Sequence, residues 1–216
     1  MKKAMIVGSG NCDLTGVDFK QYRFIMACDG GANYLSAVSE CPHALIGDFD
    51  SVEPVVNMEM EMLGVVKHHM NEEVRECTDM KSALDFLAKY DYEQIDLYGA
   101  LGTRMDHSLA NMLMLFELEE KNIRGRIVGD HNIITALMAE GEPVERSLAD
   151  APEGWTVSLV LLTHCEGLEI TGMKYELEKT DLGLDQVTRC VSNEVETNQA
   201  KVRLEKGRLL IIYTRD

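Results

Sequence analysis

The residues with the clearest chemical potential are five aspartates set in short glycine-rich or polar segments. Carboxylates gathered at one place bind a hard divalent cation, which can neutralise the oxygens of a phosphate chain. Each aspartate alone could equally cap a helix or shape a turn. Their recurrence, with glycines and one arginine interleaved, favours chemistry. They are Asp29 in DGGAN, Asp48 and Asp50 in GDFDS, Asp79 in TDMKSAL, and Asp106 in GALGTRMDHSLAN.

The segment GDFDS gives the sharpest local indication of a metal site. Asp48 and Asp50 are two residues apart, so their side chains can point the same way in an extended or turn segment. Gly47 permits a tight bend just before them. Two carboxylates form a typical partial ligand shell for Mg²⁺, which water and substrate phosphates complete.

Two glycine-containing segments could approach a phosphate chain closely. Gly30 and Gly31 follow Asp29 and open a helix, where backbone N–H groups and the helix dipole attract anions. This signal is weak by itself, because Gly-Gly after a strand is more often a plain turn. Gly99 and Gly102 permit a similarly close approach of backbone.

The basic residues near the aspartates have competing interpretations. Arg104 can donate two hydrogen bonds to phosphate oxygens, or it can form an ion pair with Asp106. Arg75 and Lys81 flank Asp79 and could offset the charge of a triphosphate. A solvated surface role is favoured for Lys81.

Several other kinds of site are disfavoured by the motifs. GSGN at Gly8–Asn11 lacks the third glycine of a dinucleotide-binding GxGxxG, and no acidic residue ends a matching second strand. The chain has no GxxxxGK[ST] phosphate loop and no GxSxG nucleophile motif. The six cysteines are scattered without a CxxC pair, so they predict neither a zinc site nor a disulfide framework.

Composition narrows the class of protein and its partners. The formal net charge of −16 argues against nucleic acid as a partner, because phosphate backbones are bound by clustered Lys and Arg. An acidic protein that handles an anionic nucleotide needs a metal to mediate the contact. No apolar run approaches the roughly 20 residues of a membrane span, and no signal-peptide pattern is present. The expectation is a cytoplasmic protein without a membrane partner.

The first part of the chain alternates short apolar runs with helical patterns, which predicts an α/β domain with right-handed crossovers. Nearly continuous apolar runs indicate strands covered on both faces, as in a parallel sheet. Strands are expected at Ala4–Gly8, Phe24–Cys28, Ala44–Gly47, Gly64–His68 and Gln94–Ala100. In such a sheet, ligands bind beyond the carboxyl ends of the strands, so aspartates at these ends can converge.

Three helices are expected between these strands and after the last. Ser51 is a candidate cap for Val52–Leu63, and Thr78 for a helix that reaches Tyr90. The second of these has an apolar stripe of Met80, Ala83, Leu84 and Leu87. A third helix, over about residues 106–121, carries Leu109, Met112, Leu113 and Phe116 at the same spacing.

The pattern changes after about residue 140. Gly141–Gly154 is rich in Pro, Gly and charge, which is typical of a linker or a long turn. Short runs with turns follow, namely TVSLVLLT, GLEITGMKYEL, CVSNEVE, AKVRLEK and RLLIIYT. They predict a small antiparallel β domain, a sandwich, which at this size would pack on the first domain or on a partner subunit.

Taken in order, the motifs resemble those of the thiamine pyrophosphokinases. DGGAN, GDFDS, TD before a helix, and GxxGTRMDHSLAN form the first part of the series, and TGMKYEL and SNE are similar to the second domain of that family. The resemblance covers nearly the whole chain. It implies an α/β domain followed by a β-sandwich, assembled as a homodimer with active sites between subunits. The expected domains are residues 1–140, which would bind ATP and Mg²⁺, and residues 150–216, which would bind thiamine and dimerise.

The implied activity is transfer of the β,γ-pyrophosphoryl unit of ATP to the hydroxyethyl oxygen of thiamine, with Mg²⁺ as cofactor and AMP as the second product. Such transfer mostly requires alignment and neutralised charge. The resemblance assigns Mg²⁺ to Asp48, Asp50 and Asp79, and ATP to Asp29, Gly30, Gly31, Asn33, Gly102 and Arg104. It assigns thiamine to Ser192, Asn193 and Asp106, and catalysis to Asp106, Arg104 and Asp79. Asp106 would lie beside the reacting groups, either as a metal ligand or as the group that orients the thiamine hydroxyl.

Alternatives stay open from the residues alone. Clustered aspartates would also serve a Mg²⁺-dependent phosphohydrolase, which would release phosphate from ATP without thiamine. A non-catalytic nucleotide- or thiamine-binding module would bind without turnover, and a related pyrophosphokinase could act on a pterin. Trp155, the only tryptophan, could stack on the thiazolium ring, although packing at the domain junction is the favoured role.

Overall fold

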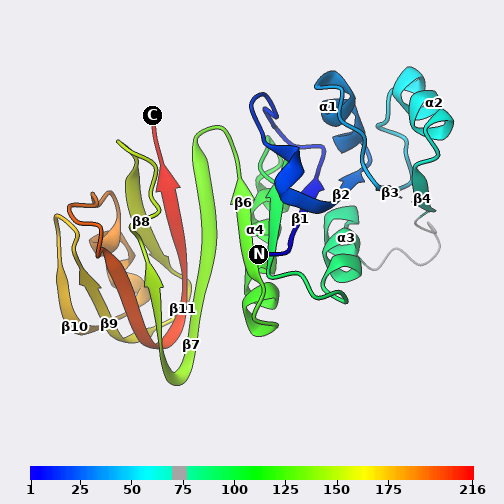
Figure 1. The fold of residues 1–216 in the computed structure, drawn as a ribbon. Coiled ribbons are helices and arrows are strands. Elements are labelled where there is room, and N and C mark those ends of the chain that lie inside the picture. The colour runs from blue at the N-terminus through cyan, green and yellow to red at the C-terminus, as the bar shows by residue number, and fades with distance from the viewer. Residues whose placement is uncertain (70–76) are drawn as a thin grey trace. The chain divides into compact units, whose positions relative to one another are not determined.

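The computed structural model describes residues 1–69 and 77–216 and divides into two compact units, Met1–Asp130 and His131–Asp216 (Figure 1). Unit 1 alternates strands with helices, and unit 2 is mainly β (Figure 1). Within the two described stretches of the chain, no helix is both long enough and apolar enough to cross a bilayer.

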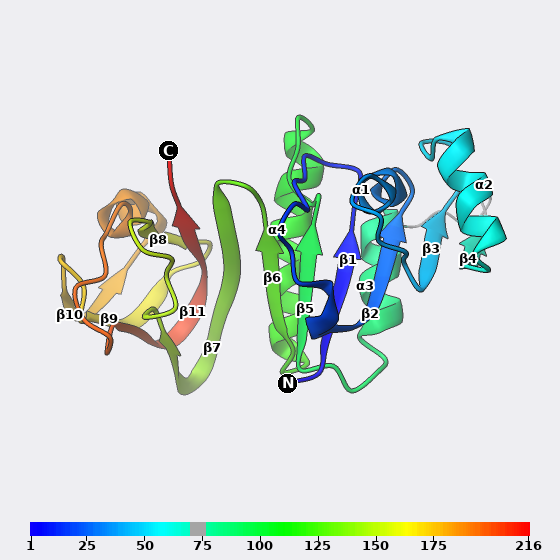
Figure 2. The same ribbon diagram turned by 45° about the horizontal axis from the view of Figure 1, so that its top comes forward.

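The centre of unit 1 is a parallel sheet with the strand order β6-β5-β1-β2-β3-β4 (Figure 2). The strands are β1 (Lys3–Val7), β2 (Tyr22–Cys28), β3 (Ala44–Gly47), β4 (Val66–His69), β5 (Gln94–Tyr98) and β6 (Arg124–Val128). The chain lays β2, β3 and β4 on one side of β1, and then returns to add β5 and β6 on the other. This reversal opens a crevice at the carboxyl ends of β1 and β5, which is where open α/β sheets bind ligands.

Four helices cover the sheet, two on each face, because the strands are apolar on both sides. α1 and α2 contact one another over the core residues Met5, Ile25 and Leu45, and α3 contacts α4 on the opposite face. The helices are α1 (Gly31–Ala37), α2 (Pro54–Met62), α3 (Asp79–Leu87) and α4 (Met105–Glu120).

The cap and the apolar stripe predicted for α3 are confirmed, although the helix ends at Leu87 and does not reach Tyr90. Thr78 caps it by accepting a hydrogen bond from the Lys81 N–H at 3.2 Å, and its predicted apolar stripe is buried. The predicted Ser51 cap of α2 is wrong. That helix begins with Pro54 after Glu53, and the Ser51 hydroxyl donates to Asp50 Oδ1 instead. A proline at the first helical position fixes where the helix starts, because its φ is already helical and it needs no N–H partner there.

The apolar stripe predicted for α4 is wrong as a buried face except at Phe116, which is buried. Leu109 and Leu113 are 51% and 47% exposed, whereas Met114, Leu115 and Leu118 are buried. α4 carries apolar residues around most of its circumference, so spacing alone could not select the face. The buried face also contains Ser108 and Asn111, whose side chains bond the loop before the helix.

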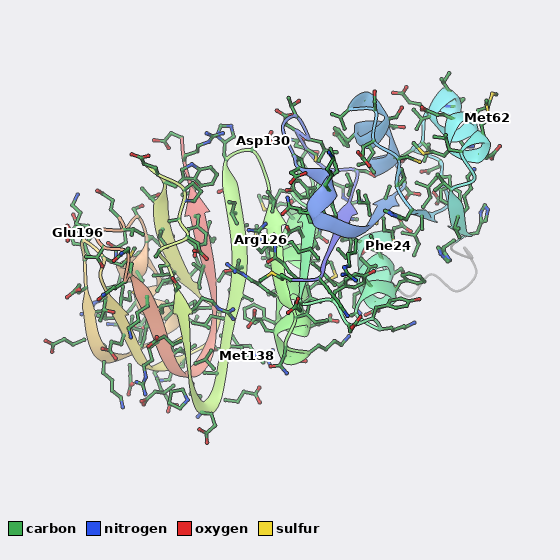
Figure 3. The ribbon with its side chains drawn as sticks, in the orientation of Figure 1. Phe24, Met62, Arg126, Asp130, Met138 and Glu196 are labelled. Atoms are coloured by element: carbon green, nitrogen blue, oxygen red, sulfur yellow. The ribbon has the colours of Figure 1, made fainter. Side chains whose placement is uncertain are left out.

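A polar cluster is buried within the sheet of unit 1. Asp96 on β5 is fully buried and accepts two hydrogen bonds from the guanidinium of Arg126 on β6, at 2.8 and 2.7 Å (Arg126 is labelled in Figure 3). Tyr22 and Gln94 donate to the same carboxylate. Every acceptor position of this buried charge is thus used, as its burial requires.

Unit 2 is built around the long antiparallel strand β11 (Lys201–Thr214). The first half of β11 pairs with β9, the second half pairs with β8, and β7 pairs along both halves. Gly207 lies between the halves with φ +126. The other strands are β7 (Asn132–Ser147), β8 (Thr156–Leu161), β9 (Cys165–Thr171) and β10 (Leu177–Leu182).

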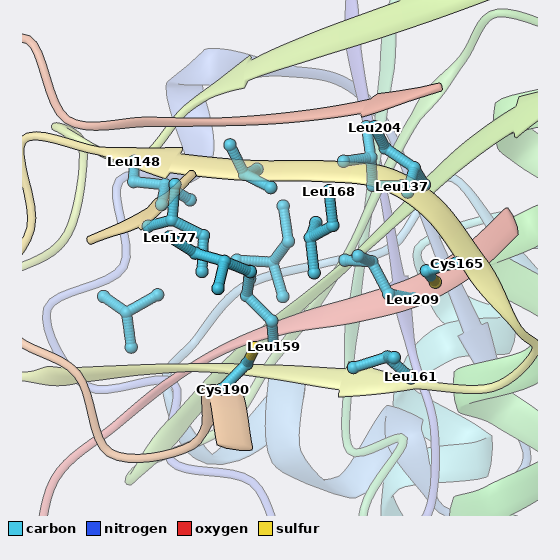
Figure 4. Close-up of a cluster of buried hydrophobic side chains, with 14 of the residues drawn as sticks. Leu137, Leu148, Leu159, Leu161, Cys165, Leu168, Leu177, Cys190, Leu204 and Leu209 are labelled. Carbon is cyan, nitrogen blue, oxygen red and sulfur yellow. The ribbon is translucent and has the colours of Figure 1, made fainter. Parts of the chain in front are cut away.

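The core of unit 2 gathers leucines and two cysteines from all these strands and from η3 (Leu184–Cys190) (Figure 4). AKVRLEK and RLLIIYT, expected as separate runs, form the single strand β11. CVSNEVE is not a strand. It contributes only isolated bridges, Val157 to Asn193 and Met173 to Val195.

The expected linker at Gly141–Gly154 is corrected by the structure. β7 continues to Ser147, and the division between the units falls after Asp130. The composition was misleading because this half of β7 exposes charged residues, while Gly141 and Pro143 lie near a register shift against β11 between Leu204 and Lys206. Irregular ladder positions tolerate glycine and proline.

Candidate functional site

A cavity of about 510 Å³ lies at the carboxyl ends of β1, β2, β3 and β5. It brings together six of the predicted site residues, Asp29, Asp48, Asp50, Asp79, Gly102 and Arg104. Asp29, Asp48 and Asp50 each offer a carboxylate oxygen, and these oxygens all lie within 4.8 Å of one another. Oxygen donors at this spacing suit a hard divalent cation.

Asp29 is held in an unusual conformation directly after β2. Its φ is +43, and one carboxylate oxygen accepts the Phe49 N–H at 3.0 Å. Gly47 makes this possible, because a Cβ at that position would lie 1.8 Å from Asp29 Oδ1. The DGG and GDFDS segments are therefore fitted to one another, and strained backbone of this kind is concentrated at functional sites.

The acidic cluster also changes the protonation of Asp29. Burial raises the pKa of the Asp29 carboxyl to about 7, and its neighbours Asp79 and Asp48 act in the same direction. The Phe49 N–H opposes this rise by favouring the carboxylate. A bound cation would favour the charged form of all these groups.

Substituting Gly47 tests the close approach to Asp29. We expect Gly47→Ala to lower the free energy of unfolding by about 2–3 kcal/mol, because the residue has φ +140 and the added Cβ would meet the carboxylate. Gly64→Ala is the matched control, since Gly64 has φ +73 and no atom of residues 1–69 or 77–216 lies within 4 Å of its added Cβ. That variant should lose only about 1 kcal/mol. If urea denaturation shows that both variants lose the same free energy of unfolding, the close approach of Gly47 to Asp29 is not what makes glycine necessary at position 47.

The glycine rim of the cavity is formed where the loops after β1 and β5 touch. The Gly10 N–H donates to the Gly99 carbonyl at 2.9 Å, and the Asn11 N–H donates to the Leu101 carbonyl at 2.8 Å. A Cβ on Gly10 would lie 2.3 Å from the Leu101 oxygen. The GSGN segment is thus part of the site because it contacts the loop after β5. The sequence did not indicate this role, because GSGN does not match a dinucleotide-binding motif.

Two residues of α4 support this rim and were missed by the sequence reasoning. Asn111 Nδ2 donates to the Ala100 carbonyl at 2.7 Å, and Ser108 Oγ accepts from the Gly102 N–H at 3.1 Å. Both residues line the cavity, and both are buried. Their only sequence signal is that they are polar positions on the buried face of an apolar helix.

Arg104 lies at the start of α4 and forms the ion pair with Asp106 that was the competing interpretation. Its Nε lies 3.2 Å from Asp106 Oδ1, and its Nη2 lies 2.5 Å from Oδ2. Arg104 lowers the pKa of Asp106 to about 2. Both side chains are about two-thirds exposed, so water screens the pair and the arginine can exchange this partner for a phosphate. Only Arg104 lines the cavity.

Several predicted residues lie outside the cavity lining. Gly31 packs α1 against β1, where a Cβ would meet the Val7 oxygen at 2.0 Å. Asn33 uses both ends of its amide, accepting from the Glu53 N–H and donating to the Ser51 carbonyl. The predicted residues of unit 1 that are absent from the lining are Gly30, Gly31, Asn33 and Asp106.

Lys81 and Arg75 flank Asp79 in the sequence and were the candidates to offset the charge of a triphosphate. Lys81 does not line the cavity, and its Nζ lies 2.6 Å from Asp85 and 3.1 Å from Glu117. Its side chain is half-buried, so it is held in these ion pairs and is less solvated than the sequence suggested. Arg75 lies outside the residues that the structure describes.

Ser192 and Asn193 belong to unit 2. Asn193 is 5% exposed, and its amide binds both backbone groups of Tyr175, accepting from the N–H at 3.0 Å and donating to the carbonyl at 2.7 Å. Ser192 is exposed and adopts φ +57. The Trp155 ring packs against the core of unit 2, with the Arg215 guanidinium 5.2 Å from its centroid.

Comparison with known protein families gives two matches. Residues 18–127 match the family described as "Thiamin pyrophosphokinase, catalytic domain", and residues 144–209 match "Thiamin pyrophosphokinase, vitamin B1 binding domain". The first match covers the acidic cluster and most of the cavity, and the second covers Ser192 and Asn193.

Individual proteins give the same result. A thiamine pyrophosphokinase of Bacillus subtilis is 26% identical over 204 residues, with 94% of this chain and 92% of that protein covered. The crystal structure of thiamine pyrophosphokinase from Bacillus subtilis superposes over 100% of both chains with a TM-score of 0.87 and 25% identity. The thiamin pyrophosphokinase from Candida albicans shares the fold at 16% identity, with a TM-score of 0.81 over 99% of this chain and 89% of its own.

Proposed function

Since the chain belongs to the thiamine pyrophosphokinase family, whose members are ATP-dependent pyrophosphotransferases, we propose that the cavity of unit 1 binds ATP with Mg²⁺ for transfer to thiamine. The reaction moves the β,γ-pyrophosphoryl group of ATP to the hydroxyl oxygen of thiamine. The hydroxyl oxygen loses its proton and bonds to the β-phosphorus, the bond between the β-phosphorus and the α,β-bridging oxygen breaks, and AMP leaves with that oxygen. The observation that carries the proposal is the convergence of Asp29, Asp48 and Asp50 beside the glycine rim.

The donor set fits a magnesium ion. Asp48, Asp50 and Asp79 are the proposed ligands, and the position of Asp29 adds a fourth carboxylate to the group. When bound, the ion would neutralise phosphate charge and fix the orientation of the phosphate chain. Without a cation, so many carboxylates would repel a triphosphate, so the acidic lining itself argues for a metal.

The remaining cavity residues would align the reactants. The backbone of Gly102 and the loops after β1 and β5 allow phosphate oxygens to come close, and Arg104 would donate to them after leaving Asp106. Asp106 does not line the cavity, but once Arg104 has left it, its carboxylate would be free to accept a hydrogen bond from the thiamine hydroxyl. Pyrophosphoryl transfer requires this alignment and charge stabilisation more than covalent participation by the protein.

Thiamine would bind with help from unit 2. The match of this unit to the vitamin B1 binding domain supports Ser192 as a contact residue. Asn193 would act through Tyr175, because its amide already binds the backbone of that residue. We further propose that the protein is a cytoplasmic homodimer, with the thiamine site shared between subunits as the family resemblance implies.

The test is a product assay of the purified protein with ATP and Mg²⁺, with and without thiamine. We expect AMP to appear only with thiamine and in an amount equal to the thiamine diphosphate formed. Replacement of Mg²⁺ by excess chelator should remove this turnover.

Other outcomes identify the alternatives. ADP and phosphate formed regardless of thiamine would indicate a phosphohydrolase. ATP binding without any turnover would indicate a binding module, or an acceptor alcohol other than thiamine.

A further inference from the structure

Phe49, the residue between Asp48 and Asp50, has a backbone conformation that its side chain disfavours. Its φ is +66, a left-handed value that is rare for a bulky residue. Such a conformation persists only where the surroundings hold it in place.

The Phe49 ring contacts two side chains of the neighbouring strand β4. Its centroid lies 4.8 Å from that of His69 in an edge-on arrangement, and Lys67 Nζ lies 5.6 Å from the same centroid. Both partners are on β4. Lys67 is itself fixed by α2, since its ammonium donates to Asn57 at 2.7 Å and to Glu61 at 2.6 Å.

The backbone of Phe49 links these ring contacts to the acidic cluster. Its N–H donates to Asp29 Oδ1 at 3.0 Å, and the next N–H, that of Asp50, donates to Asp48 Oδ1 at 3.3 Å. A rotation of the Phe49 backbone would break the first bond and change the directions of the two neighbouring carboxylates. The ring is half-buried against the core of unit 1 and does not line the cavity.

We infer that Phe49 is a positioning residue for the metal site, and that its ring, held by His69 and Lys67, keeps Asp29, Asp48 and Asp50 convergent. This inference rests on the proposed function, because it takes the acidic cluster to be the metal site. It assigns to Phe49 a role in metal affinity that involves no contact with metal or substrate. Groups that orient metal ligands in this way typically change affinity by 10–100-fold when removed.

The experiment measures the dissociation constant of Mn²⁺ for the full chain, without ATP, by the electron paramagnetic resonance signal of free Mn²⁺. We expect Phe49→Ala and Phe49→Gly to weaken Mn²⁺ binding about 10–100-fold while circular dichroism shows a folded protein. Phe49→Gly is the sharper variant. Glycine adopts φ +66 without strain, so it removes the ring but not the ability to form the turn.

Phe24→Ala is the matched control. Phe24 on β2 is a half-buried phenylalanine whose ring stacks on a histidine, His43, at 5.0 Å, and it does not line the cavity (labelled in Figure 3). This variant should bind Mn²⁺ with wild-type affinity. If it loses as much affinity as Phe49→Ala, the effect is general loosening of unit 1 and the inference is overturned.

Wild-type Mn²⁺ affinity in Phe49→Gly would also overturn the inference, since the ring would then be unnecessary. Asp50→Asn separates this failure from failure of the proposed function. If the wild-type protein binds Mn²⁺ and Asp50→Asn binds it equally well, the acidic cluster is not the metal site, and both the metal assignment and the inference fall. If Asp50→Asn loses Mn²⁺ binding but Phe49→Gly binds Mn²⁺ as the wild type does, the inference about Phe49 is overturned and the metal assignment stands.

Discussion

Asp50→Asn should lower kcat by at least roughly 10³-fold while the protein stays folded. A bound metal ion contributes several kcal/mol to stabilising transition-state charge, and the loss of a ligand would weaken or misplace the ion; each 1.4 kcal/mol is about a factor of ten in rate. Asp50 is exposed, and the amide oxygen of asparagine can still accept the Ser51 hydroxyl bond. The melting temperature should therefore change by no more than about 2 °C. Steady-state kinetics and thermal denaturation check both parts.

Glu53→Gln provides the control for this variant. Glu53 is an exposed carboxylate three residues further along, and its removal changes the net charge by the same amount. It lies outside the cavity lining, so its kcat should stay near the wild-type value. Wild-type kinetics for Asp50→Asn would refute the assignment of Asp50 to the metal.

Asp29→Asn should stabilise the metal-free protein above neutral pH while it weakens metal binding. Burial raises the pKa of Asp29 to about 7, whereas an aspartate in the unfolded chain titrates near 4. Between these values the folded state binds a proton that the unfolded state does not, so the free energy of unfolding falls as pH rises from about 4 to 7. Asparagine does not titrate, and its oxygen can still accept the Phe49 N–H.

The increase in the free energy of unfolding caused by Asp29→Asn should therefore be near zero at pH 4 and should reach its full value above pH 7. At pH 8 in chelator we expect a melting temperature roughly 3–6 °C above wild type, corresponding to about 1–2 kcal/mol. Added Mg²⁺ should stabilise the wild type more than the variant, since a ligand stabilises the state that binds it. Asp13→Asn is the control, because hydrogen bonds to Thr15 lower the pKa of Asp13, and its removal should bring no gain at pH 8. A pH-independent gain for Asp29→Asn would contradict the burial argument.

The parallel sheet could be predicted because its strands are covered on both faces and have nearly continuous apolar runs. β6 was missed for a related reason. Its Arg124 and Arg126 interrupt the apolar pattern, and Arg126 is accommodated in a half-buried position by its partner Asp96, which lies on another strand. The buried face of α4 was chosen wrongly because Leu109 and Leu113 have helical spacing but face away from the core.

The acidic residues of the site could be predicted because each follows a strand or begins a helix, and parallel strands end at one edge. The supporting contacts could not. The fit of Gly47 to Asp29 joins residues on different strands, and Asn111 acts by binding the Ala100 carbonyl across a loop. Neither contact leaves a local pattern in composition or spacing, because each depends on how separate elements pack.

Because β1 lies between β2 and β5, the parts of the site can assemble only in a fixed order while the chain is being synthesised. Val7 pairs with Ala27 on one side and with Tyr98 on the other. The carboxylates up to Asp50 can gather once β2 and β3 have joined β1, but the glycine rim and Asn111 follow only when β5 and α4 arrive. Asn111 lies 111 − 50 = 61 residues after Asp50, so at about 5–20 residues per second the ribosome needs roughly 3–12 s more to supply the rim. A nascent chain therefore contains the acidic cluster before it contains the whole lining of the cavity.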